Sequence, residues 1–79
     1  MNKLDEMIIK YICESKEQKL DFPINLETHL SEIGMSSLEF IKFVVAIEET
    51  LDIEFDDKVL ADSYFVIVGD LVDYVSSKV

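Results

Sequence analysis

The stretch Gly34-Met35-Ser36-Ser37-Leu38-Glu39-Phe40 decides how this chain folds, because it joins a flexible glycine to a helix-start signal. Ser36, with Glu39 three residues later, fits a capping box, in which two side chains satisfy backbone N–H groups at a helix start. A helix is therefore predicted from about Ser37 to Leu51. Gly34 lets the chain turn sharply just before it.

The apolar side of this predicted helix is broader than one core contact needs. Its stripe consists of Phe40, Val44, Ile47 and Leu51, and it is widened by Leu38, Ile41 and Val45. The side expected to face water carries Glu39, Lys42, Ala46 and Glu49. Part of the apolar arc is therefore expected either to be over-buried in a small bundle or to be exposed for a partner.

Working outward, helical spacing recurs at both ends of the chain. Residues 2–17 place apolar side chains on one face, with Asp5, Glu6, Lys10 and Glu14 opposite, and the spacing predicts a helix. Val68 to Lys78 predicts the last helix, although its β-branched content also suits a strand. Ile67 stands where a capping residue is usual, so the first turn of this helix is expected to fray.

The segments between these helices lack a lasting period. Residues 18–36 carry many large apolar groups and predict an ordered loop packed across the helices, with one short turn near Leu30. Residues 52–57 alternate acidic and apolar side chains and predict an extended loop. Asp56 or Asp57 can cap a short helix through residues 58–61.

Together these elements predict an all-α, four-helix bundle: three main helices, one short helix and a long first loop. With 79 residues and a mass of 9.1 kDa, the chain is expected to form a single domain over residues 1–79. This size lies near the lower limit for a self-sufficient core.

The charge balance restricts the possible partners. Seven lysines against 17 acidic residues give a net charge of −10, which argues against nucleic acid and against an anionic membrane surface. Partners with basic patches are favoured. No apolar stretch is long enough to span a membrane, and the first residues do not fit a signal peptide. Cys13 is the only cysteine and fits a reducing cytoplasm, so a cytoplasmic monomer is expected.

Ser37 is the candidate for chemistry. If Ser36 is used for capping, the Ser37 hydroxyl is left to project outward. A phosphate attached there would lie beside unpaired backbone N–H groups and the positive end of the helix dipole. The alternative is that both serines only cap the helix.

Three runs in the sequence, Leu30–Ile41, Ile47–Asp57 and Val68–Val75, resemble the carrier-protein family of acyl and peptidyl carrier proteins. The resemblance covers nearly the whole chain and implies a four-helix bundle. It also implies that Ser37 carries 4′-phosphopantetheine from coenzyme A, whose thiol holds an acyl or aminoacyl group as a thioester. The protein itself would catalyse nothing.

The resemblance also implies partners. They are a phosphopantetheinyl transferase, an adenylating ligase or acyltransferase, and a condensation enzyme or ketosynthase. The residues expected to meet them are Met35, Ser36, Leu38, Ile41, Lys42, Val45, Glu48 and Tyr64.

The chain departs from the family pattern at positions that bear on the pathway. Ser36 stands where many members have Asp, and Lys42 stands where fatty-acid carriers often have an acid. These changes favour a discrete peptidyl carrier of a nonribosomal-peptide-like pathway over an acyl carrier of polyketide or fatty-acid synthesis. A third hypothesis is an acidic interaction module that binds a basic partner and is never modified.

The other candidate residues have simpler interpretations. Asp52, Glu54 and Asp56 resemble the start of a calcium loop, but Asp57 and Ser63 occupy the positions that need Gly and Glu, so no metal site is expected. His29 is expected in a loop, and Cys13 as a buried inert thiol. The aromatic residues expected mostly in the core are Tyr11, Phe22, Phe40, Phe55 and Phe65. Phe43 is expected between core and surface, and Tyr64 beside the path of a bound chain.

Overall fold

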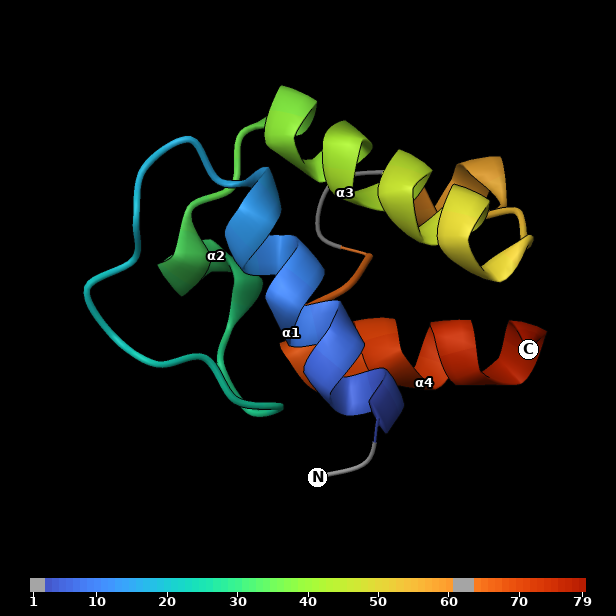
Figure 1. The fold of residues 1–79 in the computed structure, drawn as a ribbon, viewed down its shortest axis with the longest axis horizontal. Coiled ribbons are helices and arrows are strands. Elements are labelled where there is room, and N and C mark those ends of the chain that lie inside the picture. The colour runs from blue at the N-terminus through green and yellow to red at the C-terminus, as the bar shows by residue number, and fades with distance from the viewer. Residues whose placement is uncertain (1–2, 61–63) are drawn as a thin grey trace.

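A computed structural model describes residues 3–60 and 64–79, and over these residues the protein is a helical bundle with no β-strand (Figure 1). The elements are α1 (Lys3–Ser15), α2 (Leu30–Ile33), α3 (Ser37–Leu51), the 3₁₀ helix η1 (Asp57–Leu60) and α4 (Val68–Lys78). In Figure 1, α3 lies above α4, and α1 crosses between them in front. The predicted all-α bundle with a long first loop is confirmed.

Both short elements correspond to predictions. The turn expected near Leu30 is α2, and the short helix expected at residues 58–61 is η1, although Ala61 lies outside the described residues. Ser63, part of the calcium-loop comparison, also lies outside them.

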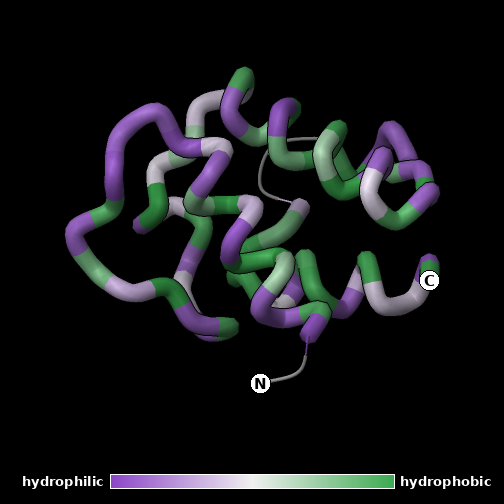
Figure 2. Tube along the Cα trace, in the orientation of Figure 1, coloured by the Kyte–Doolittle hydropathy of each residue, from purple (hydrophilic) through white to green (hydrophobic). Residues whose placement is uncertain are grey.

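The core is built where α1 contacts α3 and α4. Its fully buried side chains include Ile8 and Ile12 from α1, Phe43 from α3 and Leu71 from α4. Burying one such side chain stabilises the fold by roughly 1.5–3 kcal/mol. Figure 2 shows apolar residues alternating with polar ones along the helices, and a mostly polar stretch where the first loop leaves α1.

Phe43 and Glu39 of α3 lie differently from the prediction, whereas the exposed part of the apolar arc agrees with it. Phe43 is completely buried, whereas Leu38, Ile41 and Val45 are 60%, 45% and 44% exposed. Glu39, expected to face water, is buried. The apolar arc spans both sides of the helix, so hydropathy alone could not fix its rotation. The core takes Phe43, Val44 and Ile47, and Leu38, Ile41 and Val45 are left to solvent.

Smaller predictions also need correction. Cys13 is exposed, because it lies one residue past the buried Ile12 and therefore points away from the α1 core face. Asp5, expected opposite that face, is buried. Phe22 is 37% exposed, whereas Leu20 and Ile24 of the same loop are half-buried against the core.

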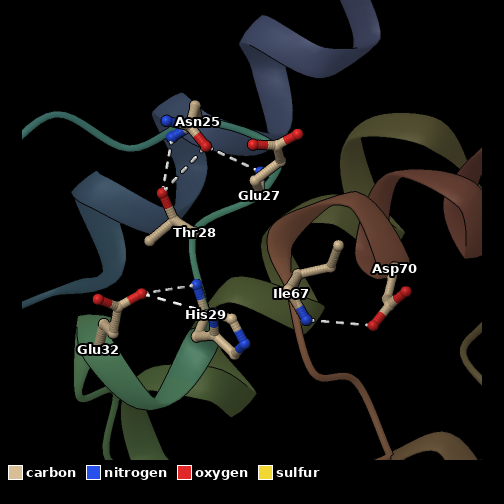
Figure 3. Close-up of polar contacts among 7 residues, drawn as sticks. All are labelled: Asn25, Glu27, Thr28, His29, Glu32, Ile67 and Asp70. Carbon is tan, nitrogen blue, oxygen red and sulfur yellow. Dashed lines mark hydrogen bonds and ion pairs between the residues drawn. The ribbon is translucent and has the colours of Figure 1, made fainter.

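The start of α4 does not fray as expected. The Ile67 side chain makes no capping hydrogen bond, but the N–H groups of Val68 and Gly69 donate to the carbonyls of Thr28 (3.0 Å) and Leu26 (2.8 Å). Asp70 accepts from the backbone N–H of Ile67 at 3.1 Å (Figure 3). The first loop therefore supplies the cap that the side chain at position 67 lacks.

Candidate attachment site

Ser37 is the first residue of α3 and is exposed. The cap before it is complete. The Ser36 hydroxyl accepts from the N–H of Glu39 at 3.1 Å, and the Glu39 carboxylate accepts from the N–H of Ser36 at 2.8 Å. The predicted capping box is confirmed, and Ser36 is the residue used for it. The Ser37 hydroxyl makes no hydrogen bond to any other described residue.

The first backbone N–H groups of α3 begin at this serine, and two of those that follow are already bonded. The N–H of Phe40 bonds back to the Ser36 carbonyl at 2.9 Å, and that of Glu39 is taken by the Ser36 side chain. Within residues 3–60 and 64–79, no group accepts a hydrogen bond from the N–H of Ser37 or of Leu38. Open N–H groups and the macrodipole of a 15-residue helix favour an anion at this end.

Gly34 sets the entry into the site. It adopts the left-handed conformation, with φ 71° and ψ 38°, and its N–H closes α2 onto the Leu30 carbonyl at 3.1 Å. A Cβ at Gly34 would meet nothing within 4 Å, so the requirement for glycine is conformational rather than steric. For other L-residues this conformation costs roughly 1–2 kcal/mol.

Glu39 joins this region to the end of α1. Its carboxylate accepts from the N–H of Glu17 at 2.8 Å and lies 3.6 Å from the Lys16 ammonium. Lys16 also donates to the Gly34 carbonyl at 3.0 Å. The hydrogen bonds from the N–H groups of Glu17 and Ser36, aided by the Lys16 charge, lower the Glu39 pKa from 4.5 to about 2 against the opposing effect of burial.

An apolar pocket of about 480 Å³ opens beside Ser37. Phe40 and Ile41 of α3, Leu60 of η1 and Phe65 form part of its wall. The remaining lining residues are His29, Leu30, Ser31, Met35, Ser36, Ser37 and Val66. This volume is in the range of small-molecule sites, roughly 300–1,000 Å³. The sequence did not reveal the pocket, because its walls come from segments far apart in the chain.

A family model described as "Phosphopantetheine attachment site" matches residues 10–75, which include this site. The chain belongs to the carrier-protein family, that of the acyl and peptidyl carrier proteins. Proteins of this family carry covalently attached 4′-phosphopantetheine, and the family is one of carriers rather than catalysts.

Relatives and a solved structure agree with the family assignment. The chain is 48% identical over 46 residues to the mitochondrial acyl carrier protein of Saccharomyces cerevisiae, covering 58% of this chain and 35% of that protein. It thus spans about a third of that relative. It is 28% identical over 78 residues to the acyl carrier protein of Buchnera aphidicola from Schizaphis graminum, covering 99% and 96%. A crystal structure of an acyl carrier protein from Thermotoga maritima matches with a TM-score of 0.75 and 25% identity, over 96% of this chain and 86% of that one.

The residues at Ser37 fit the prosthetic group of this carrier family. An exposed hydroxyl is available for a phosphodiester, the N–H groups at the start of α3 could donate to its phosphate, and an apolar pocket includes the same residue in its lining. When bound, the group supplies a terminal thiol. Ser37 and the start of α3 would hold its phosphate end.

The residues predicted to meet partners separate into groups in this carrier protein. Leu38, Ile41, Lys42 and Val45 are exposed together on α3, and Tyr64 is 51% exposed. Met35 and Ser36 line the pocket. The half-buried Glu48 accepts from the N–H of Phe55 at 2.7 Å, so one of its carboxylate oxygens is used within the fold.

Two kinds of feature are absent from the described residues. In residues 3–60 and 64–79, no three His, Cys, Asp or Glu side chains gather closely enough to hold a metal ion. No helix in these ranges has the length and apolar character needed to cross a membrane.

Proposed function

We propose that this protein is a carrier whose Ser37 receives 4′-phosphopantetheine and presents a thioester-bound cargo to successive enzymes. One observation carries the proposal: of the two adjacent serines, Ser36 is used by the cap, while the Ser37 hydroxyl is exposed at the positive end of α3. The protein's own contribution is to tether and to raise effective concentration, without catalysing a reaction.

The cargo that the pocket favours is an acyl chain with an aliphatic part. The wall is mainly apolar, and the pocket begins at the attachment residue, so a chain carried at Ser37 can fold back into it. Acyl carrier proteins are also what the compared relatives are named. A peptidyl cargo in a discrete natural-product pathway is the second candidate, favoured by the exposed Lys42.

The partners that we propose are a phosphopantetheinyl transferase, an acyltransferase or adenylating ligase, and a ketosynthase or condensation enzyme, in the cytoplasm. They would dock on the α3 face formed by Leu38, Ile41 and Val45 and on the exposed Tyr64, whose ring packs against that of the pocket residue Phe65. Lys42 lies four residues after Leu38 and three before Val45, so it places a cation within this apolar face. A carboxylate on the partner would complement it.

The experiment that tests the attachment compares the two serines. The protein is incubated with coenzyme A and a broad-specificity phosphopantetheinyl transferase, and its intact mass is recorded. We expect the wild type and Ser36→Ala to gain one arm and Ser37→Ala to gain none. Failure of the wild type to gain mass with several active transferases would favour the unmodified acidic module. A gain in Ser37→Ala would place the attachment elsewhere.

The cargo is tested by loading. The protein carrying the arm is charged with octanoyl or with an aminoacyl group, and the amide NMR shifts of Phe40, Leu60 and Phe65 are followed. We expect the octanoyl form to shift these signals more than the aminoacyl form. Equal, small shifts would favour the peptidyl reading.

A further inference from the structure

Acidic residues occupy the third helical position at the starts of α2, α3 and α4, but they differ in reach. Glu32 accepts from the N–H of His29 at 3.1 Å, and its side chain is 62% exposed. Asp70 accepts from the N–H groups of Val66 and Ile67. Glu32 also lies 3.6 Å from the His29 ring Nδ1, so both acids bind only residues three or four positions before them in the chain.

Glu39 differs, because its two carboxylate oxygens accept hydrogen bonds from two different segments of the chain. Oε1 accepts from the N–H of Ser36, three residues earlier, and Oε2 accepts from the N–H of Glu17, 22 residues earlier. Its side chain is only 10% exposed. A charge-assisted bond that is shielded from water is stronger than one on the surface.

Lys16 adds a second connection between the same two segments. Its ammonium donates to the Gly34 carbonyl and pairs with Glu39 Oε1. Lys16 therefore holds the turn at Gly34 directly, while Glu17 is tied to the other end, Ser36, through the Glu39 carboxylate. Ser37 follows this turn directly, so its backbone direction depends on these contacts.

We propose that Glu39 and Lys16 act as a positioning clamp that ties the end of α1 to the entry of α3 and fixes the direction in which Ser37 meets the modifying enzyme. This inference rests on the proposed attachment at Ser37. Both residues act through the backbone around the serine and do not touch the reacting atoms. The end of α1, remote in sequence, thereby becomes part of the attachment site.

The test uses Glu39→Gln, with Glu32→Gln as the matched control. In glutamine an NH2 group replaces one of the two carboxylate oxygens, so a donor would face the N–H of either Ser36 or Glu17 and that hydrogen bond would be lost. With the transferase and coenzyme A, we expect kcat/KM for Glu39→Gln to fall about tenfold, the order expected for one lost bond to a charged group. Glu32→Gln makes the same chemical change at an exposed α2 cap and should keep the wild-type value.

A structural role is separated from a positioning role by working where every variant is fully folded by circular dichroism. A purely structural Glu39 would then lower the melting temperature and leave kcat/KM unchanged, and this outcome overturns the proposal. Glu39→Asp keeps both acceptor oxygens on a shorter arm and should recover part of the lost rate. Absence of any recovery, with an aspartate variant that folds, also counts against positioning by the carboxylate.

Lys16→Met keeps the inference testable if Glu39→Gln does not fold. Methionine retains the apolar stem but cannot bond to the Gly34 carbonyl, so kcat/KM should fall about threefold. Lys19→Met, an exposed lysine in the same loop, is the control and should have no effect. Wild-type kinetics in Lys16→Met would overturn the proposal.

Amide hydrogen exchange separates failure of the clamp from failure of the proposed function. Even if the wild type takes up no arm, Glu39→Gln should exchange the N–H groups of Glu17 and Ser36 faster than Glu32→Gln does. Equal exchange in the two variants would refute the clamp, whatever happens at Ser37.

Discussion

The starts of α3 and α4 solve the same problem in opposite ways. The first backbone N–H groups of each helix have no hydrogen-bond acceptor within the helix. At α3 a serine side chain takes one of them, and those of Ser37 and Leu38 stay open beside an exposed hydroxyl. At α4 the N–H groups of Val68 and Gly69 are taken by carbonyls of the first loop.

The difference shows what makes a helix start available for chemistry. Main-chain capping at α4 brings the Leu26 carbonyl against the helix, and an added Cβ at Gly69 would lie only 3.1 Å from that oxygen. No group could be attached there without displacing the loop. Side-chain capping at α3 uses one residue and leaves the next in solvent. The start of α4 is therefore closed to attachment, and the start of α3 is open to it.

Adding a side chain at Gly69, at the start of α4, should have the largest effect on folding stability. Gly69→Val adds a branched side chain where even a Cβ is already tight against backbone, so we expect about 2 kcal/mol of destabilisation. Urea unfolding followed by circular dichroism measures it. Ser76→Val, at an exposed position on the same helix, is the control for valine propensity. A cost no larger than that of the control would mean that the loop does not cap α4 closely.

Exchanging the capping side chains should have a smaller effect. Ser36→Ala removes the side-chain cap of α3 and should cost about 1 kcal/mol. Ile67→Thr supplies α4 with a capping side chain, yet it should gain no stability, because loop carbonyls already accept the first N–H groups and half-buried apolar area is lost. Both values come from chemical denaturation. A clear gain from Ile67→Thr would show that the α4 start is less well capped than its geometry implies.

The same contrast explains what could be predicted from the sequence. The start of α3 is predictable from the sequence, because Ser36 and Glu39 are three residues apart and a capping box is a local pattern. The α4 start was misjudged, because its acceptors at Leu26 and Thr28 lie in a distant loop. Glu39 was expected in water for the same reason, since the N–H of Glu17 is not visible from helical periodicity.

In the site, too, the locally encoded part is predictable and the part formed by distant segments is not. The exposed Ser37 follows from its place directly after the cap, and it was predicted. The pocket beside it needs Leu60 and Phe65 to be brought against α3, and no local pattern encodes this arrangement. Phe43 was placed at the core boundary because α3 is apolar on both sides, so packing alone decides which side is buried.

Acid should reduce the contribution of Glu39, at the start of α3, to folding stability in a defined pH window. The Glu39 pKa is lowered to about 2 from 4.5, so the folded state favours the charged carboxylate. Its stabilisation is complete above pH 4.5 and is lost as the pH falls from there towards 2. The stability difference between the wild type and Glu39→Gln should therefore be constant near neutral pH and shrink across this window.

Denaturant midpoints for both proteins, measured from neutral pH down through the window, test this expectation. Asp56 also has a lowered pKa, because the Tyr74 hydroxyl and then the Lys78 charge favour its carboxylate. It is present in both proteins, so its effect cancels in the difference. A difference that stays unchanged below pH 4.5 would show that the Glu39 carboxylate does not hold the α3 start through its charge.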